Sequence, residues 1–271
     1  MLAQARIWWT ILRVSLDERL VYRGDFALGT LMRFLPIVTQ IFLWSAVFAA
    51  RESDTLAGYT YEQFVAYYLL TMVTRAFSSM PALASGIAAQ IRSGEIKKFL
   101  IQPIDMVGYL LAGRVAHKLA YYSVAAGPFV LVFFLCRGYF DGWPDATTMV
   151  AFLTSLVLCF MLGFYLEASM GLVGFWFLEV SSLLFVYMLF SFFLSGHMFP
   201  LDMLPEPWQT IVEVSPLQYL AYFPSAVFLG RVRGVDLALG LVQEALWVMF
   251  FMALCKLLFL RGTRRYSAYG G

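Results

Sequence analysis

The chain has 271 residues, of which 61% are hydrophobic and only 13% are charged. This composition excludes a soluble globular domain, because such domains carry about 25% charged residues. A membrane-spanning helix needs roughly 20 mostly apolar residues, so the chain has room for about six such helices and little else. The net charge of +2 does not indicate nucleic-acid binding. The three cysteines, Cys136, Cys159 and Cys255, are widely spaced, and we expect them to be unpaired.

The segment 5–22 has the pattern of an amphipathic helix. Arg6 and Arg13 fall on one stripe of a helical wheel, whereas Trp8 and Trp9 lie on the opposite arc. A basic helix that carries tryptophan before the first apolar run is typical of a helix lying flat in the membrane interface. We therefore expect an interfacial helix here.

Apolar stretches with short polar connections make up most of the remaining sequence. We predict an all-α integral membrane protein with one transmembrane domain over 1–271 and six transmembrane helices. The predicted spans are 26–50, 61–85, 109–136, 147–173, 180–195 and 235–260.

Lysine and arginine are unevenly divided between the two ends of these spans. If the N-terminus is inside, most basic residues fall in cytoplasmic segments. The exceptions are Arg51, Arg137, Arg231 and Arg233. The positive-inside rule then places both termini in the cytoplasm. We expect a multi-pass protein of the cytoplasmic (inner) membrane.

The longest charged interruption between two apolar runs is the loop 88–108. Its apolar residues recur at roughly helical spacing among the charges, so a short amphipathic helix at the membrane surface is one interpretation. An ordinary cytosolic loop is the other. The residues of this loop that we single out as a candidate contact surface are Ile91, Arg92, Glu95, Lys97, Lys98, Phe99 and Leu100.

The segment 196–234 is too apolar for an ordinary loop and too rich in proline for a single span. Two short helices fit between its prolines, Trp208–Val214 and Leu217–Leu229. Irregular backbone is tolerated at membrane depth only where protein or water satisfies its polar groups. We therefore predict re-entrant or outer-face helices that cap the bundle, and we name 196–234 the capping segment.

The capping segment resembles the loop after the fifth span of type-2 ABC exporter permeases. That pattern has a glycine, a Pro-Leu pair, a second proline, an aromatic residue, and then a proline followed by tyrosine. Its counterparts here are Gly196, Pro200, Leu201, Pro205, Trp208, Pro216 and Tyr219. The run Ser93–Pro103 is similar to the cytosolic loop between spans two and three of that family, and the resemblance covers the whole chain.

The resemblance implies the permease subunit of an ATP-driven exporter that moves a hydrophobic or amphipathic substrate. Two such subunits, identical or related, would form the pathway, and cytosolic ATP-binding cassette subunits would bind beneath them. The family's coupling helix, which docks on the ATPase, is carried onto Ile91–Gln102, with Phe99 and Leu100 as the expected apolar anchors. ATP and Mg²⁺ are expected in the partner ATPase, with no cofactor, metal or catalytic residue in this chain. The sequence agrees, because it has no phosphate-binding loop of the form GxxxxGK[ST].

Among the charged residues inside predicted spans are Arg75, Lys118 and Glu167, which the topology puts in three adjacent spans. A lone charge in a bilayer is costly, so we expect these side chains to face inward and find partners. One hypothesis is that Glu167 pairs with Arg75 or Lys118. The alternative is that Lys118 reaches the interface and Glu167 is protonated or contacts water.

Two other classes of function stay open at this point. An intramembrane enzyme would need ordered polar residues within the spans, and Arg75 and Glu167 are the clearest candidates. His117 and His197 are too far apart in the predicted topology to share a site. A non-enzymatic scaffold or assembly protein fits the hydropathy, but leaves the charged loop and the capping segment unexplained. The aromatic residues of the spans suit lipid-like cargo, although packing and lipid contact are their commoner roles.

Overall fold

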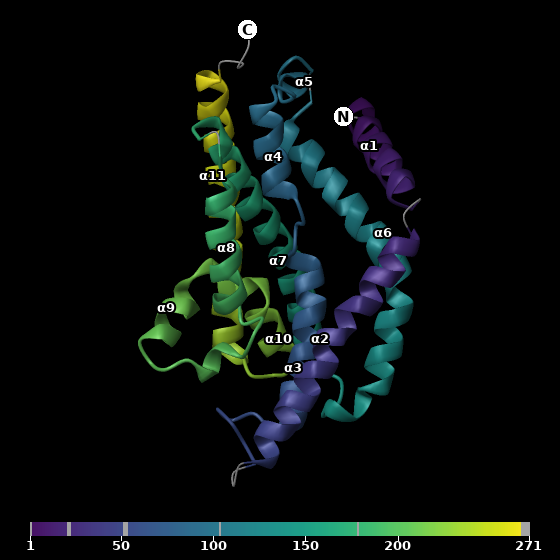
Figure 1. Cartoon of the computed structure of the whole chain (residues 1–271), viewed down its shortest axis with the longest axis vertical. Helices are drawn as coiled ribbons and strands as arrows, with labels where there is room; N and C mark the ends of the chain where they lie inside the picture. Colours follow the sequence, from purple (N-terminus) through teal and green to yellow (C-terminus); the bar gives the residue numbers. More distant parts are fainter. Residues whose placement is uncertain (1, 21–22, 51–53, 103, 178, 267–271) are drawn as a thin grey trace. The chain divides into compact units, whose positions relative to one another are not determined.

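The computed structural model describes residues 2–20, 23–50, 54–102, 104–177 and 179–266. Across these ranges the chain is almost entirely helical, and the one strand-like feature is an isolated bridge between Leu56 and Tyr59 (Figure 1). The predicted all-α class is therefore confirmed. The helices form two compact units, one of Met1–Asp54 with Phe99–Asp141 and the other of Thr55–Lys98 with Gly142–Gly271.

In the first unit, one long helix packs against two others. The helices are α1 (Leu2–Leu20), α2 (Arg23–Ala49) and α6 (Met106–Leu135), with α6 contacting both α1 and α2. Asp105 caps α6 by accepting a hydrogen bond from the Gly108 amide at 2.6 Å. A Cβ atom on Gly108 would lie 2.9 Å from the Trp8 ring, so the glycine allows α1 to approach closely. The rings of Phe34 and Phe129, 5.7 Å apart, join α2 to α6.

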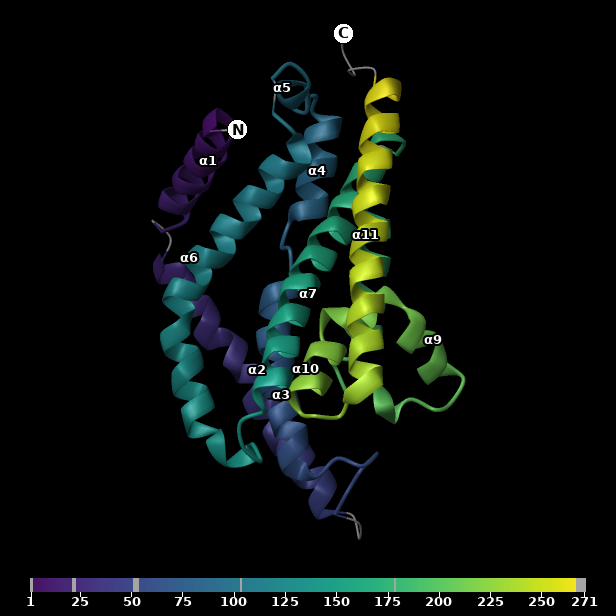
Figure 2. The same ribbon diagram turned by 180° about the vertical axis from the view of Figure 1, so that it is seen from behind.

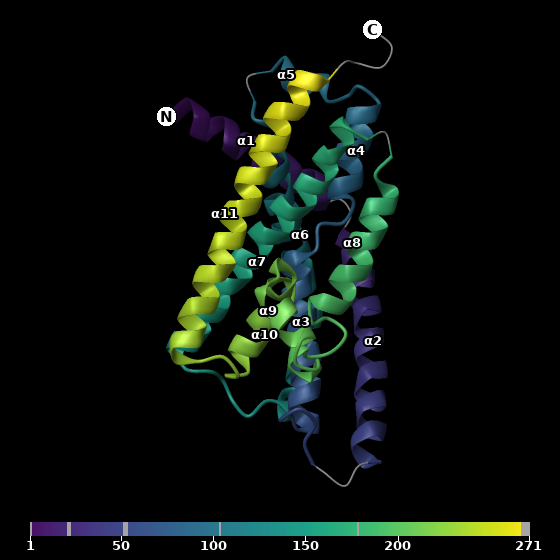
Figure 3. The ribbon, with the colours of Figure 1, turned by 90° about the vertical axis from the view of Figure 1, so that its left-hand side faces the viewer.

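The second unit is built around α7 (Ala146–Leu172), which packs along α11 (Figures 2 and 3). Its other neighbours are α4, α3 and α10. The remaining bounds in this unit are α3 (Tyr61–Ser78), α4 (Leu83–Arg92), α8 (Ser181–Leu194), α10 (Tyr222–Phe228) and α11 (Gly234–Arg265).

Glycines on α7 bring neighbouring backbones into contact with it. A Cβ atom on Gly163 would overlap the Ser78 carbonyl at the end of α3, and one on Gly171 would lie 2.7 Å from the Ala84 carbonyl oxygen of α4. Lipid tails are as apolar as leucine, so membrane helices associate through such close packing of small residues. The position of α7 at the centre of the unit depends on these glycines.

The stretch predicted as one span over 61–85 is two helices in the structure. α3 ends at Ser78, and α4 begins at Leu83 after an irregular connection. Pro81 has no amide hydrogen to donate, and Ala82 has a φ of 59°, which is left-handed backbone. The Ser79–Ala82 connection, which we name the α3–α4 break, therefore interrupts the expected span.

Three of the described helical segments are long and apolar enough to cross a membrane, namely Met106–Leu135, Ala146–Phe175 and Gly234–Arg265. Two shorter apolar helices, Phe34–Ala49 and Ser181–Leu194, coincide with parts of the first and fifth predicted spans. The count of six spans stays a prediction.

The capping segment consists of short helical pieces. They are η3 (Leu201–Met203), α9 (Trp208–Val214), η4 (Pro216–Leu220) and α10. Helix α9 has the bounds expected from the sequence. The second expected helix, 217–229, is divided at Ala221, where the helical backbone is interrupted.

Candidate functional site

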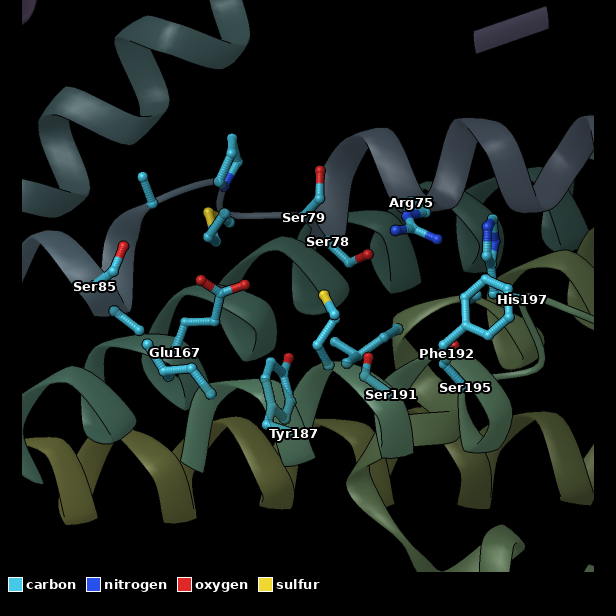
Figure 4. A pocket seen from close by; sticks show the side chains of 18 residues that line it. Arg75, Ser78, Ser79, Ser85, Glu167, Tyr187, Ser191, Phe192, Ser195 and His197 are labelled. Carbon is cyan, nitrogen blue, oxygen red and sulfur yellow. The ribbon is translucent and has the colours of Figure 1, made fainter. Parts of the chain in front are cut away.

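A pocket of about 310 Å³ opens within the second unit beside the α3–α4 break. Its walls come from α3, α4, α7 and α8, and from residues 195, 197, 220 and 221 of the following segments (Figure 4). The pocket exists because the chain does not continue as a helix between Ser78 and Leu83.

Polar side chains are gathered in this pocket, although it lies among apolar helices. Arg75 comes from α3, Glu167 from α7 and Tyr187 from α8, while His197 follows α8. Figure 4 shows Glu167 and Tyr187 toward one end and Arg75 and His197 toward the other. The rest of the polar lining is serine: Ser78, Ser79, Ser85, Ser191 and Ser195. The pocket therefore offers a basic group, an acidic group and hydroxyl groups beside apolar surface.

His197 adds a neutral group to the pocket. Burial, and then the nearby Arg75 guanidinium, lower the pKa of His197 to about 4. Its Nδ1 atom is buried and has no hydrogen-bond partner among the described groups. At neutral pH its imidazole is uncharged, so the basic end of the pocket carries the charge of Arg75 alone.

One wall of the pocket is held in place by tyrosines. The Tyr67 hydroxyl donates to the Gly196 carbonyl, and the Tyr68 hydroxyl donates to the Met198 carbonyl at 2.6 Å. The Tyr222 amide donates to the Ser195 carbonyl at 2.9 Å. Gly196 itself has a φ of +78° and no room for a Cβ, since one would lie 2.8 Å from the Tyr67 hydroxyl. The first residue of the capping-segment pattern is thus a glycine for conformational and steric reasons.

The structure brings together two of the three intramembrane charges predicted from the sequence. Arg75 and Glu167 both line the pocket. Lys118 lies on α6 in the other unit and is 9% exposed there. The pairing of Glu167 with Arg75 or Lys118 stays a prediction.

The loop 88–108 differs from the single helix expected over 91–102. Helix α4 ends at Arg92, Gly94 turns the chain with a φ of +79°, and α5 is only Lys97–Leu100. A glycine in this left-handed conformation stops a helix. The loop therefore contains the end of α4 and the short helix α5, with a glycine turn between them.

The apolar and charged residues of this loop separate by burial. Ile91 and Ile96 are buried, and so is Phe99, whose ring lies 5.4 Å from that of Tyr109. Leu100 is 41% exposed and Ile101 is 81% exposed. Arg92 and Glu179 form an exposed ion pair at 3.2 Å. Glu95, Lys97 and Lys98 are exposed.

The capping-segment residues carry different roles. Leu201 and Tyr219 are each 1% exposed and Pro200 is also buried, so they pack inside the unit. Trp208 is 59% exposed, and Pro205 is exposed as well. Pro216 opens η4, as expected for a proline at the start of a helix.

Sequence reasoning missed two acidic groups that accept hydrogen bonds from distant parts of the second unit, Glu244 and Asp202. Glu244 of α11 is fully buried and accepts a hydrogen bond from the Ser155 hydroxyl of α7 at 2.8 Å. Its position inside the sixth predicted span could have identified it, because ionisable residues in spans are rare. Asp202 follows the Pro200-Leu201 pair and accepts hydrogen bonds from Tyr59 and Tyr222. Only the structure places these three residues together.

The described residues contain no cluster of three or more His, Cys, Asp or Glu side chains that could hold a metal ion. His117 and His197 belong to different units. All three cysteines are free thiols.

Comparison with known families gives a direct result. The family described as ABC-2 family transporter protein matches residues 34–270, which covers parts of both units. A search of curated proteins gives no match. The family match confirms the resemblance seen in the capping segment and the loop 88–108, and with it a multi-pass membrane protein of the permease type. The chain belongs to the ABC-2 transporter family.

Proposed function

We propose that this chain is the permease subunit of an ATP-driven exporter, and that its cargo is amphipathic and passes through the pocket beside the α3–α4 break. The main support for this proposal is the set of residues that line the pocket. Arg75, Glu167 and the serines provide polar contacts, whereas Leu184, Met188 and Phe192 provide apolar ones. A molecule with a polar head and an apolar body matches such a lining.

Energy would come from a separate ATP-binding cassette subunit, with ATP and Mg²⁺ bound there. Family membership implies this kind of partner, and the sequence of this chain contains no phosphate-binding loop. The subunit would lie in the cytoplasmic membrane with both termini inside. It would act with a second permease chain, identical or related.

The docking region for the ATPase would be the exposed part of the loop 88–108. Leu100 and Ile101 are its exposed apolar residues, and the neighbouring Lys97 and Lys98 are exposed cations. Interface energy usually concentrates in a few apolar or aromatic side chains that become buried on binding. Phe99 is already buried against Tyr109, so Leu100 and Ile101 are the better anchors.

A pocket-filling variant tests the proposed pathway. Leu184 lines the pocket on α8, whereas Leu189 lies on the same helix, does not line the pocket, and is 48% exposed. In proteoliposomes of the complex with its ATPase, Leu184→Trp should remove most ATP-dependent transport of a fluorescent short-chain phospholipid. Leu189→Trp is the matched control and should transport normally. Equal transport by both variants would exclude the pocket as the pathway.

A docking variant tests the coupling separately. Replacing Leu100 and Ile101 together by Ala should reduce recovery of the ATPase during purification of the complex and leave membrane insertion intact. Phe99→Ala is the contrasting variant, because its main effect should be on the stability of this chain. Full ATPase recovery with the double variant would exclude these anchors.

A further inference from the structure

The segment after α8 is hydrogen-bonded to α3 and to the residue just before the N-cap of α3. We name residues 195–203 the strap. Near its start the strap is bound through the Gly196 and Met198 carbonyls to Tyr67 and Tyr68. Near its end it is bound through Asp202 to Tyr59, which directly precedes α3. Side-chain hydroxyls of α3 and of Tyr59, which lies just before that helix, therefore hold the strap near both ends.

Asp202 forms the most connected point of the strap. Its Oδ2 accepts a hydrogen bond from the Tyr59 hydroxyl at 2.5 Å, and its Oδ1 accepts one from the Tyr222 hydroxyl. Tyr59 is fully buried and Tyr222 is 7% exposed. Burial first, and then the Asp202 carboxylate, raise the pKa of both tyrosines, so both remain hydrogen-bond donors.

Arg231 completes this cluster from the far end of the capping segment. Its guanidinium lies 4.0 Å from the centroid of the Tyr59 ring. It also donates to the Ala57 and Gly58 carbonyls at 3.2 and 2.9 Å. Tyr59 is therefore fixed on its ring face as well as at its hydroxyl, which makes it a firm anchor for Asp202.

The strap is also a wall of the pocket. Ser195 and His197 line it, and so do Leu220 and Ala221, which immediately precede Tyr222. The Tyr222 amide holds the Ser195 carbonyl at the pocket, while the Tyr222 hydroxyl holds Asp202. A shift of Tyr222 away from Asp202 would therefore move the pocket wall with it.

We propose that the strap is a gate on the pocket and that Asp202, held by Tyr59 and Tyr222, is its latch. The inference rests on the proposed function, in which cargo passes through this pocket. The latch is polar, with a carboxylate that water can solvate when the two hydroxyls withdraw. Within this wall Gly196 lies between Ser195 and His197, and its left-handed backbone is a natural hinge. When the latch opens, Ser195 and His197 can move away from the pocket, and the pocket becomes accessible on this side.

Chemical labelling of the pocket wall tests the latch without any transport measurement. Ser195 is only 4% exposed, so a Ser195→Cys thiol in an otherwise cysteine-free chain should react slowly with a membrane-impermeant maleimide. In the purified complex in lipid nanodiscs, Asp202→Ala should raise this rate by about tenfold, the order expected when hydrogen bonds to a charged acceptor are lost. Tyr222→Phe keeps the ring and removes one hydroxyl, so it should give a smaller increase.

Two controls separate gate opening from general loosening. Asp236→Ala removes an exposed carboxylate at the start of α11 and should leave Ser195→Cys labelling unchanged. In a chain that retains only Cys255, which is 1% exposed on α11, Asp202→Ala should not increase labelling. Parallel increases at Ser195→Cys and Cys255 would overturn the proposal in favour of a purely structural role.

Unchanged Ser195→Cys labelling in both Asp202→Ala and Tyr222→Phe would also overturn the latch. That result would leave the pathway itself untouched, because the pocket-filling variant is judged by transport. A failure of the pocket-filling test alone would instead exclude the pathway and leave the labelling result in place.

Discussion

Helices α7 and α8 are both strongly apolar and both line the pocket, yet they are used in opposite ways. Helix α7 packs on four other helices and has many buried residues, including Phe164 at 0% exposure. Helix α8 has no buried residue, and its side chains Phe185 and Phe190 are 58% and 56% exposed. Hydropathy alone does not distinguish them.

Small residues explain the difference. Helix α7 carries Gly163 and Gly171 where the backbones of α3 and α4 approach, and Ser155 where it meets α11. Helix α8 is Ser-Ser-Leu-Leu-Phe-Val-Tyr-Met-Leu-Phe-Ser-Phe-Phe-Leu and contains no glycine. In a membrane, close approach of helices depends on such small and polar positions more than on apolar area. The face of α8 away from the pocket therefore suits lipid or another chain.

Filling the contact between α7 and α3 should have a large effect on stability. Gly163→Ala places a Cβ against the Ser78 carbonyl. This carbonyl belongs to the backbone, so it cannot rotate away from the new methyl group as a side chain could. We expect a loss of about 3 kcal/mol in unfolding free energy, the upper part of the range for overpacking. Thermal unfolding of the detergent-purified protein measures it.

Gly113→Ala on α6 is the matched control, because nothing lies within 4 Å of its added Cβ. It should be neutral or slightly stabilising, since alanine is the better helix former. If both variants unfold alike, the close approach at Gly163 does not position α7.

The bond between α7 and α11 should give the next largest effect. Ser155→Ala removes the donor to Glu244 Oε2, and Glu244 Oε1 has no hydrogen-bond partner among the described groups. A fully buried carboxyl left without hydrogen bonds should cost about 2 kcal/mol, measurable by thermal unfolding. Thr154→Val is the control, because the exposed Thr154 hydroxyl donates to the Val150 carbonyl of its own helix. An equal loss in both variants would contradict a role for the Ser155–Glu244 bond.

The sequence was a good guide where a pattern is local. Helix α9 was expected over Trp208–Val214 because Pro207 precedes it and Pro216 follows it closely, and the structure has those bounds. The permease family was also recognisable from the spacing of glycine, prolines and aromatic residues in the capping segment. Such features depend on backbone chemistry of nearby residues, which a single sequence displays.

The pocket and the latch could not be found in this way. A hydropathy window over 61–85 averages across Ser78, Ser79 and Pro81, so it conceals the α3–α4 break that opens the pocket. Tyr59 and Asp202 are 143 positions apart, and nothing local indicates that they meet. Phe99 was expected to be available for docking, but it packs against Tyr109. Each of these depends on tertiary contacts.

The charged groups of the pocket should contribute less than the packing of α7. Glu167→Gln should lower the unfolding free energy by about 1 kcal/mol if Arg75 is its partner, a modest value because Arg75 is exposed. Adding Arg75→Gln should then restore part of the loss. A double-mutant cycle of thermal unfolding gives the coupling energy.

Lys118 provides the contrasting cycle. If Glu167→Gln with Lys118→Gln shows the coupling and the Arg75 double variant does not, the partner of Glu167 is Lys118. If neither double variant is better than Glu167→Gln alone, both pairings are wrong. Glu167 would then be available for cargo.

The smallest effect is expected on the exposed face of α8. Phe190→Ala should change the unfolding free energy in detergent by no more than about 0.5 kcal/mol, as is usual for exposed positions. Phe164→Ala on α7 should cost about 3–5 kcal/mol, because a fully buried ring leaves a cavity. Both variants should also be measured in the assembled complex, where α8 can be covered by a partner chain. A loss at Phe190 that appears only in the complex would mean that a partner chain, and not lipid, covers α8. A loss already present in the isolated chain would contradict the contrast between the two helices.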